Sequence, residues 1–241
     1  MKKTITIVLI LIPLIFLFRC KNPSNTQVFY LNGNFIGVRK ASTIRFYETR
    51  DQKTWKYSAN KDFSEVEHID GAFYFNGSFI GIRMGKTVKF YKTDKTGAWK
   101  YSPGKDFTSP NGIDGIFSFN GNPLGVWQGK TIKFYDTNRR GEWAKSNTKD
   151  FTANSNIDAA FHLARNYMGV LEGRTIKFYA LSPQGDWNSV SDIDFTGPTE
   201  ADNVFCLSTG ALAIIKGNVI KFYTLNQQKK WIYNTGNDFK F

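Results

Sequence analysis

Histidine and cysteine are nearly absent from this sequence of 241 residues, which contains two of each. Such a small number, without metal-ligand spacing, excludes a disulfide framework and indicates no metal site. The sequence also lacks a nucleophile elbow, a zinc-protease motif and a phosphate-binding loop. We therefore expect no catalytic residue, no metal and no cofactor, and predict that the protein is not an enzyme.

Helical patterning is equally scarce. No stretch keeps an apolar period of about 3.6 residues long enough to form a substantial helix. Aromatic residues are abundant instead, with 22 Phe and 11 Tyr. Aromatic and β-branched side chains favour half-buried pleated sheets, so the composition indicates an all-β protein.

Acidic residues are outnumbered by basic ones, 20 to 32, which gives a formal net charge of +12. A positive surface attracts acidic glycans, anionic head groups or nucleic acid. A solvated lysine-rich surface without any such partner explains the charge equally well. We expect a glycan or a surface protein as partner, and not a nucleic acid.

Long apolar runs are absent except at the start of the chain. Residues 4–18 follow a basic start at residues 1–3 and end at Arg19 and Cys20, after which the sequence turns polar. A run of about 15 residues is too short for a comfortable membrane span but suits the core of an export signal. The segment resembles a bacterial lipoprotein signal, in which the cysteine is lipidated. Arg19 departs from that pattern, since a small residue usually precedes the cysteine.

Two interpretations of this segment remain open: lipid attachment at Cys20, or an ordinary signal peptide or uncleaved anchor. We predict a signal peptide at 1–19, a lipidated linker at 20–26 and an exported protein of the cell envelope. The lipid would anchor it to a bacterial membrane, at the outer membrane or cell surface. Cys206 then has no partner within the chain and is expected to be a buried small hydrophobe.

The rest of the chain repeats itself every 44 residues without insertion or deletion. A leading phenylalanine, a Phe-Tyr pair, a tryptophan and an Asp-Phe pair each recur five times in one register, which indicates a repeat architecture. The predicted propeller domain, residues 27–241, has no room for a second domain, and its repeats are 27–70, 71–114, 115–158, 159–202 and 203–241. The tryptophans are Trp55, Trp99, Trp143, Trp187 and Trp231.

Each repeat predicts four short antiparallel strands, the size of one propeller blade. Asn-Gly pairs at Asn32, Asn76 and Asn120 predict tight hairpin turns, because both turn positions require a positive φ. An open solenoid is the alternative, but solenoids need polar end caps and the terminal copies keep all the aromatic markers. We predict an all-β, five-bladed β-propeller with one four-stranded antiparallel sheet per 44-residue repeat. No strand is spare for exchange between first and last blades, so closure should rest on side-chain packing.

Repeat starts such as Asp158-Ala159-Ala160-Phe161, followed by glycine before the aromatic pair, resemble the hemopexin repeat. The copy number, the missing disulfide and the scattered histidines depart from that family, so haem ligation is not implied. In repeat count and length the chain is also similar to five-bladed tachylectin-type lectins, which bind amino sugars once per blade. Both resemblances imply a binding role, although a fold alone does not determine function.

The repeated side chains have two interpretations each. Exposed tryptophans would be platforms for sugar rings, whereas buried ones would pack blade on blade. The cations that repeat beside the Phe-Tyr pairs would ring an anion site or make structural contacts. They are Arg45, Lys89, Lys133, Lys177 and Lys221.

A specific site is expected where the symmetry breaks. One repeat position holds Arg39, Arg83 and Trp127 in adjacent copies, which predicts one asymmetric pocket for an acidic or ring-shaped ligand. Another break, His68 with Glu67, is the only basis for a hydrolase hypothesis. We predict a non-enzymatic binding protein of the cell envelope, lectin-like with multivalent carbohydrate sites. The alternative is a propeller for protein–protein adhesion or scaffolding.

Overall fold

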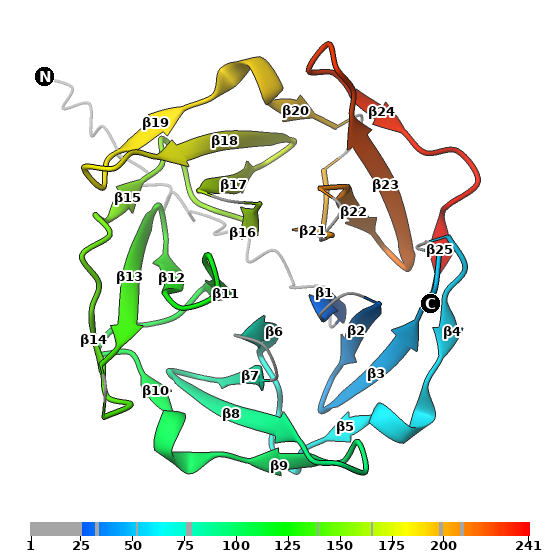
Figure 1. Cartoon of the computed structure of the whole chain (residues 1–241), viewed down its shortest axis with the longest axis vertical. Helices are drawn as coiled ribbons and strands as arrows, with labels where there is room; N and C mark the ends of the chain where they lie inside the picture. Colours follow the sequence, from blue (N-terminus) through cyan, green and yellow to red (C-terminus); the bar gives the residue numbers. More distant parts are fainter. Residues whose placement is uncertain are drawn as a thin grey trace, which may run out of the picture.

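The computed structural model describes residues 26–31, 34–51, 53–75, 79–138, 140–164, 166–197, 200–207 and 210–241. Within these ranges, five antiparallel sheets stand as blades around a central axis (Figure 1). The prediction of a five-bladed β-propeller is confirmed. The predicted signal peptide and Cys20 lie outside the described residues, so lipidation and export stay predictions.

No helix within the described ranges combines the length and the hydrophobicity needed to span a bilayer. The helical elements found there are three 3₁₀ turns, of three residues each.

Blade 1 shows the plan of all five. The innermost strand β1 (Thr26–Leu31) pairs with β2 (Phe35–Lys40), which pairs with β3 (Thr43–Glu48). Two short strands share the outer edge of β3: β4 (Lys56–Tyr57) lies beside its end and β5 (Phe63–Ser64) beside its start. The blade is therefore four strands wide, as predicted, but its outer strand is interrupted by a loop.

The other blades follow the same order. Blade 2 contains β6 (Gly71–Phe75), β7 (Phe79–Met84), β8 (Thr87–Thr93), β9 (Trp99–Tyr101) and β10 (Phe107–Thr108). Blade 3 contains β11 (Gly115–Ser118), β12 (Leu124–Gln128), β13 (Thr131–Thr137), β14 (Trp143–Lys145) and β15 (Phe151–Thr152). Blade 4 contains β16 (Ala159–Leu163), β17 (Tyr167–Glu172), β18 (Thr175–Leu181), β19 (Trp187–Ser189) and β20 (Phe195–Thr196). Blade 5 contains β21 (Asn203–Cys206), β22 (Leu212–Lys216), β23 (Val219–Leu225), β24 (Trp231–Tyr233) and β25 (Phe239–Lys240). The 3₁₀ turns are η1 (Ala59–Lys61), η2 (Pro103–Lys105) and η3 (Ser191–Ile193).

The Asn-Gly hairpin prediction is confirmed where the structure describes the turn. Asn120 and Gly121, between β11 and β12, have φ values of 45° and 87°, and both lie in the left-handed region that such a turn requires. The other two Asn-Gly pairs lie outside the described residues.

The core is built from contacts between neighbouring blades. The phenylalanine of each Phe-Tyr pair is almost fully buried, and the tryptophan of the next blade stacks on it. Trp99 of blade 2, for example, stacks on Phe46 of blade 1 with ring centroids 5.6 Å apart. Its indole N–H also donates a hydrogen bond of 2.8 Å to the backbone carbonyl of Lys61.

The leading phenylalanines pack inside each blade. The ring of Phe73 lies over Gly81 on the neighbouring strand, so close that a Cβ atom on Gly81 would sit 2.3 Å from it. Glycine is therefore required at this position for the aromatic ring to lie flat on the sheet.

Side-chain packing closes the ring, as predicted. Trp55 of blade 1 stacks on Phe222 of blade 5, and Phe239 packs against Trp55. The amide of Asn203, on the innermost strand of blade 5, donates a hydrogen bond of 3.1 Å to the carbonyl of Val28 in blade 1. The first and last blades thus lie side by side (Figure 1).

Candidate functional site

The five repeated tryptophans lie between blades. Trp55 is 9% exposed and the other four are half-buried. Four of the five indole N–H groups donate to a backbone carbonyl of the preceding blade, so their contacts are structural. A role of these tryptophans as separate glycan platforms stays a prediction, and Trp187 lines an open hollow.

The repeated cations also make local contacts on the outer parts of the blades. The guanidinium of Arg45 lies 5.9 Å from the ring centre of Tyr57, and the ammonium of Lys221 lies 5.3 Å from that of Tyr233. Lys177 forms an ion pair of 3.2 Å with Glu172. Because these three cations lie on the outer parts of the blades, they do not form a shared anion site around the axis.

A repeated pair of polar residues lies on the outer strand and the loop that follows it. In blade 5 the phenol of Tyr233 donates a hydrogen bond of 2.7 Å to the carboxylate of Asp238, which raises the pKa of Tyr233 to about 12. The same bond joins Tyr57 to Asp62 and Tyr101 to Asp106, and in blade 3 the ammonium of Lys145 lies 3.2 Å from Asp150.

Blade 4 breaks this pattern. Ser189 takes the place of the tyrosine or lysine, and no hydrogen bond joins it to Asp194 within the described part of the chain. Asp194 accepts a hydrogen bond from the backbone N–H of Phe178 at 3.0 Å, as Asp62 of blade 1 does from that of Phe46 at 3.4 Å. Although the residue is exposed, partial burial of its carboxyl group raises the pKa of Asp194, with the N–H of Phe178 acting against that shift.

Ser189 and Asp194 line a hollow of about 550 Å³ between blades 3 and 4, which we call the blade-4 cleft. Its wall contains three aromatic side chains, Phe151, Tyr179 and Trp187. Asp194 supplies a carboxylate, and Asn154 and Lys177 supply hydrogen-bond donors. This combination of aromatic faces and convergent polar groups is typical of a small-molecule site.

The structure brings Arg39, Arg83 and Trp127 together, and their role in binding a ligand stays a prediction. All three line one hollow of about 160 Å³ where the innermost strands of the blades begin, which we call the axial mouth. A small residue faces each of the two largest side chains across the hairpin: Gly71 is opposite Arg83 and Gly115 is opposite Trp127. A Cβ atom on Gly115 would lie 1.9 Å from the Trp127 ring, so glycine is needed there.

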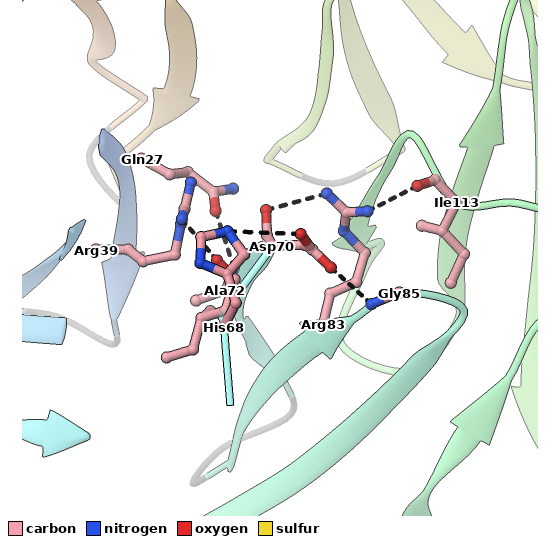
Figure 2. Close-up of polar contacts among 9 residues, drawn as sticks. Gln27, Arg39, His68, Asp70, Ala72, Arg83, Gly85 and Ile113 are labelled. Carbon is pink, nitrogen blue, oxygen red and sulfur yellow. Dashed lines mark hydrogen bonds and ion pairs between the residues drawn. The ribbon is translucent and has the colours of Figure 1, made fainter. Parts of the chain in front are cut away.

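Both arginines connect neighbouring blades (Figure 2). Arg39 Nη1 donates to the carbonyl of Ile69 at 2.6 Å, and Arg83 Nη1 donates to that of Ile113 at 2.7 Å. A second nitrogen of Arg83 donates to the carbonyl of Asp70 at 3.0 Å. Burial lowers the pKa of both guanidinium groups below the ordinary value.

Neither histidine lines the blade-4 cleft or the axial mouth. His68 lies 3.7 Å from Asp70, whereas Glu65 accepts a hydrogen bond from the phenol of Tyr91. The ring of His162 meets that of Phe119 edge-on at 5.0 Å. These positions do not bring His68 and His162 to one site, and the absence of catalysis stays a prediction.

Cys206 lies on the innermost strand of blade 5 and is half-buried. Desolvation raises the pKa of its thiol to about 12. A thiol with such a pKa is not a reactive nucleophile at neutral pH.

Sequence comparison gives no relatives, since no family model and no curated protein matches the chain. Solved structures do match. A functionally unknown protein from Desulfotomaculum acetoxidans matches with a TM-score of 0.50 and 11% identity, over 86% of this chain and 67% of that one. A protein from Lactobacillus plantarum matches with a TM-score of 0.49 and 11% identity, over 84% of this chain and 67% of that one. At this identity, the first match is one of fold alone. The propeller fold suggests a binding or scaffold role.

Proposed function

We propose that the protein is a non-enzymatic carbohydrate-binding propeller whose sugar site is the blade-4 cleft. The observation that carries this proposal is that, among the described residues, no phenol or ammonium group bonds to Asp194. In the other four blades a phenol or an ammonium group lies on the equivalent carboxylate. In blade 4 the short side chain of Ser189 leaves that place to a ligand.

The chemistry of the cleft suits a sugar ring. A carboxylate accepts hydrogen bonds from hydroxyl groups, and bonds to an ionised acceptor are stronger than neutral ones. Asn154 and Lys177 donate to ring or hydroxyl oxygens, while Tyr179 and Trp187 offer apolar faces to C–H groups. The ion pair between Lys149 and Asp186, 2.6 Å, lies in the wall of the cleft.

The cleft changes the expected number of sites. The sequence predicted multivalent binding, with one equivalent site per blade. The tyrosines of blades 1, 2 and 5 already occupy the place beside the carboxylate, so we propose one open sugar site per chain. Avidity would then come from many chains displayed together on a surface.

Display on the cell envelope is part of this proposal. Its support is the export-type start of the sequence, residues 4–18, followed by Cys20. Labelled palmitate should enter the protein in cells that produce the full chain, and Cys20→Ala should abolish the label. A parent chain that takes up no label and stays in the cytoplasm would remove this part of the proposal.

A glycan array tests the sugar site. The parent protein should bind a defined set of glycans, and Ser189→Tyr should abolish that binding by supplying the phenol that blades 1, 2 and 5 carry. Asn188→Tyr is the matched control, because neighbouring residues of a strand point to opposite faces, and it should bind like the parent. A folded parent protein that binds no glycan contradicts the proposal.

One observation favours the alternative, a protein-binding scaffold. Large apolar side chains are exposed on the outer strands of the adjacent blades 5, 1 and 2: Ile232 is 49% exposed, Tyr57 52% and Tyr101 46%. A blank glycan array together with specific cross-linking through this rim to one envelope protein would favour the scaffold over the lectin.

A further inference from the structure

An ion pair of blade 4 lies beside the blade-4 cleft. The ammonium group of Lys177, which lines the cleft, is 3.2 Å from the carboxylate of Glu172. The hydroxyl of Ser155 donates a hydrogen bond of 2.5 Å to the same carboxylate oxygen. The side chain of Glu172 is 6% exposed, against 30% for that of Lys177. Glu172 is therefore a buried partner, held from two sides, behind a cation that reaches the cleft.

The acidic residue of this pair is particular to blade 4. A cation stands at the position of Lys177 in all five repeats, but Glu172 is the only acidic residue at its own repeat position. The equivalent residues of the other repeats are Lys40, Met84, Gln128 and Lys216. The acid thus occurs in the one blade whose outer carboxylate, Asp194, bonds to no phenol or ammonium group among the described residues.

The other charged side chains of the cleft wall are also paired. Lys149 lies 2.6 Å from Asp186, and Asp150 of the wall lies 3.2 Å from Lys145. No ammonium or guanidinium group in the described part of the chain forms an ion pair with Asp194. Three cations therefore stand against four carboxylates, and the cleft with its ion-pair partners carries one net negative charge.

The charge of Glu172 acts on Asp194. Burial is the largest cause of the raised pKa of Asp194, and the negative charge of Glu172 raises this pKa further, whereas the positive charge of Lys177 lowers it. At the open carboxylate of the cleft, Glu172 therefore offsets the attraction that Lys177 would exert on an anion.

We propose that Glu172 makes the blade-4 cleft selective for neutral sugars and against acidic ones such as uronic acids, an inference that rests on the proposed sugar site. The carboxylate of an acidic sugar would meet the charge of Asp194, while the charge of Lys177 is already compensated. Like charges brought together suppress the wrong partner. A neutral sugar donates its hydroxyl groups to Asp194 and accepts from the N–H groups of Lys177 that do not face Glu172.

The overall charge of the protein favours the opposite ligand class. A formal net charge of +12 attracts acidic glycans to the surface as a whole. In the cleft, the nearest charges are Asp194 and the pair of Lys177 with Glu172, and we assign the specificity to these local charges. A change of net charge far from the cleft should therefore leave the specificity unchanged.

Matched glycans test the inference on the full chain in detergent. A glycan array presents each neutral glycan beside a counterpart in which one hexose carries a carboxylate at C6. The parent protein should bind at least one neutral glycan, and its acidic counterpart should bind about ten-fold more weakly in calorimetric titration. Equal or tighter binding of the acidic counterpart, with both glycans lost in Ser189→Tyr, overturns the inference and leaves the sugar site in place. A folded parent that binds no glycan contradicts the proposed function, and this inference with it.

Glu172→Gln tests the role of Glu172 itself. Glutamine keeps an oxygen for the donors of Ser155 and Lys177, and Gln128 occupies the same position in blade 3, so the variant should fold. Its affinity for the acidic counterpart should rise about ten-fold, while its affinity for the neutral glycan should stay within about two-fold of the parent. A merely structural role of Glu172 would weaken both glycans alike, and an unchanged ratio of the two affinities contradicts the inference.

Two further variants control this result. Glu67→Gln removes the same charge from an exposed residue between blades 1 and 2 and should leave the ratio as in the parent. Adding Lys177→Gln to Glu172→Gln should remove the gain for the acidic glycan, because the gain requires the freed cation. A gain that persists in the double variant, or that appears in Glu67→Gln, contradicts the assignment of specificity to this ion pair.

Discussion

Trp55 stacks on Phe222 with ring centroids 6.3 Å apart and planes inclined by 13°, and this contact joins the first blade to the last. The same stack forms at the other four blade junctions, for example between Trp231 and Phe178. Only the closing junction lacks the indole hydrogen bond, because the Trp55 N–H is buried without a partner among the described residues. The ring therefore closes by aromatic packing and by the bond from Asn203 to Val28, without an indole hydrogen bond among the described residues.

This difference predicts an unequal effect of one substitution at two positions. Trp99→Phe removes a bonded N–H and leaves the Lys61 carbonyl unpartnered, whereas Trp55→Phe removes an N–H that bonds nothing. In urea unfolding, Trp99→Phe should lose about 0.5–1.5 kcal/mol more than Trp55→Phe. An equal or greater loss for Trp55→Phe would contradict the description of the seam.

The contact between Phe73 and Gly81 predicts a second stability effect. Gly81→Ala places a Cβ atom 2.3 Å from the phenylalanine ring, and overpacking of this kind costs about 1–3 kcal/mol. Gly104→Ala is the control, since nothing lies within 4 Å of its Cβ position. Thermal unfolding of both variants checks this, and an unchanged midpoint for Gly81→Ala would show that the ring moves aside freely.

A new sugar site should appear when the phenol of another blade is removed. Tyr233→Ser frees the Asp238 carboxylate beside Trp231 and Tyr223, as Ser189 does for Asp194 in blade 4. Titration of the variant should show two sugars bound per chain where the parent binds one. If the stoichiometry stays at one in a correctly folded variant, a carboxylate without a side-chain partner is not sufficient to make the site.

The raised pKa of Asp194 predicts opposite effects on stability and binding. A folded-state pKa above the ordinary value means that ionised Asp194 costs stability. That cost is fully present above the raised pKa and disappears below the ordinary pKa. Asp194→Asn keeps an oxygen for the Phe178 N–H, so its urea midpoint at neutral pH should equal or exceed that of the parent.

The same substitution should abolish sugar binding at neutral pH. Binding by the parent should weaken as the pH falls through the raised pKa, because the protonated carboxyl is a weaker acceptor. A lower urea midpoint for Asp194→Asn at neutral pH, with the midpoints converging in acid, would contradict the sign of the shift.

The sequence was sufficient to predict the propeller because its aromatic residues recur every 44 residues without insertion or deletion. The period of 44 residues gave the number of blades, and the Asn120–Gly121 turn followed from local backbone chemistry. The partner of each tryptophan could not be predicted, because Phe46 and Trp99 belong to different blades and meet only when the blades pack. The interrupted outer strand was also missed, since β4 and β5 are only two residues long.

The two hollows differ in how far the sequence predicted them. Arg39, Arg83 and Trp127 were grouped from one broken repeat position, and the structure brings them together. The bonds from the arginines to Ile69 and Ile113 depend on the spacing of neighbouring blades and had no sequence signal. Ser189 did carry a signal: it stands where three repeats have tyrosine, five residues before the aspartate. This signal could be interpreted only after the structure showed the hydrogen bond between Tyr233 and Asp238.

Calorimetric titration of the parent protein and Ser189→Tyr, with the glycan that gives the strongest array signal, tests the central claim most directly. We predict one glycan bound per parent chain, no detectable binding by the variant, and a thermal midpoint for the variant at or above that of the parent. Equal affinity in the two proteins would contradict the claim that the blade-4 cleft is the binding site.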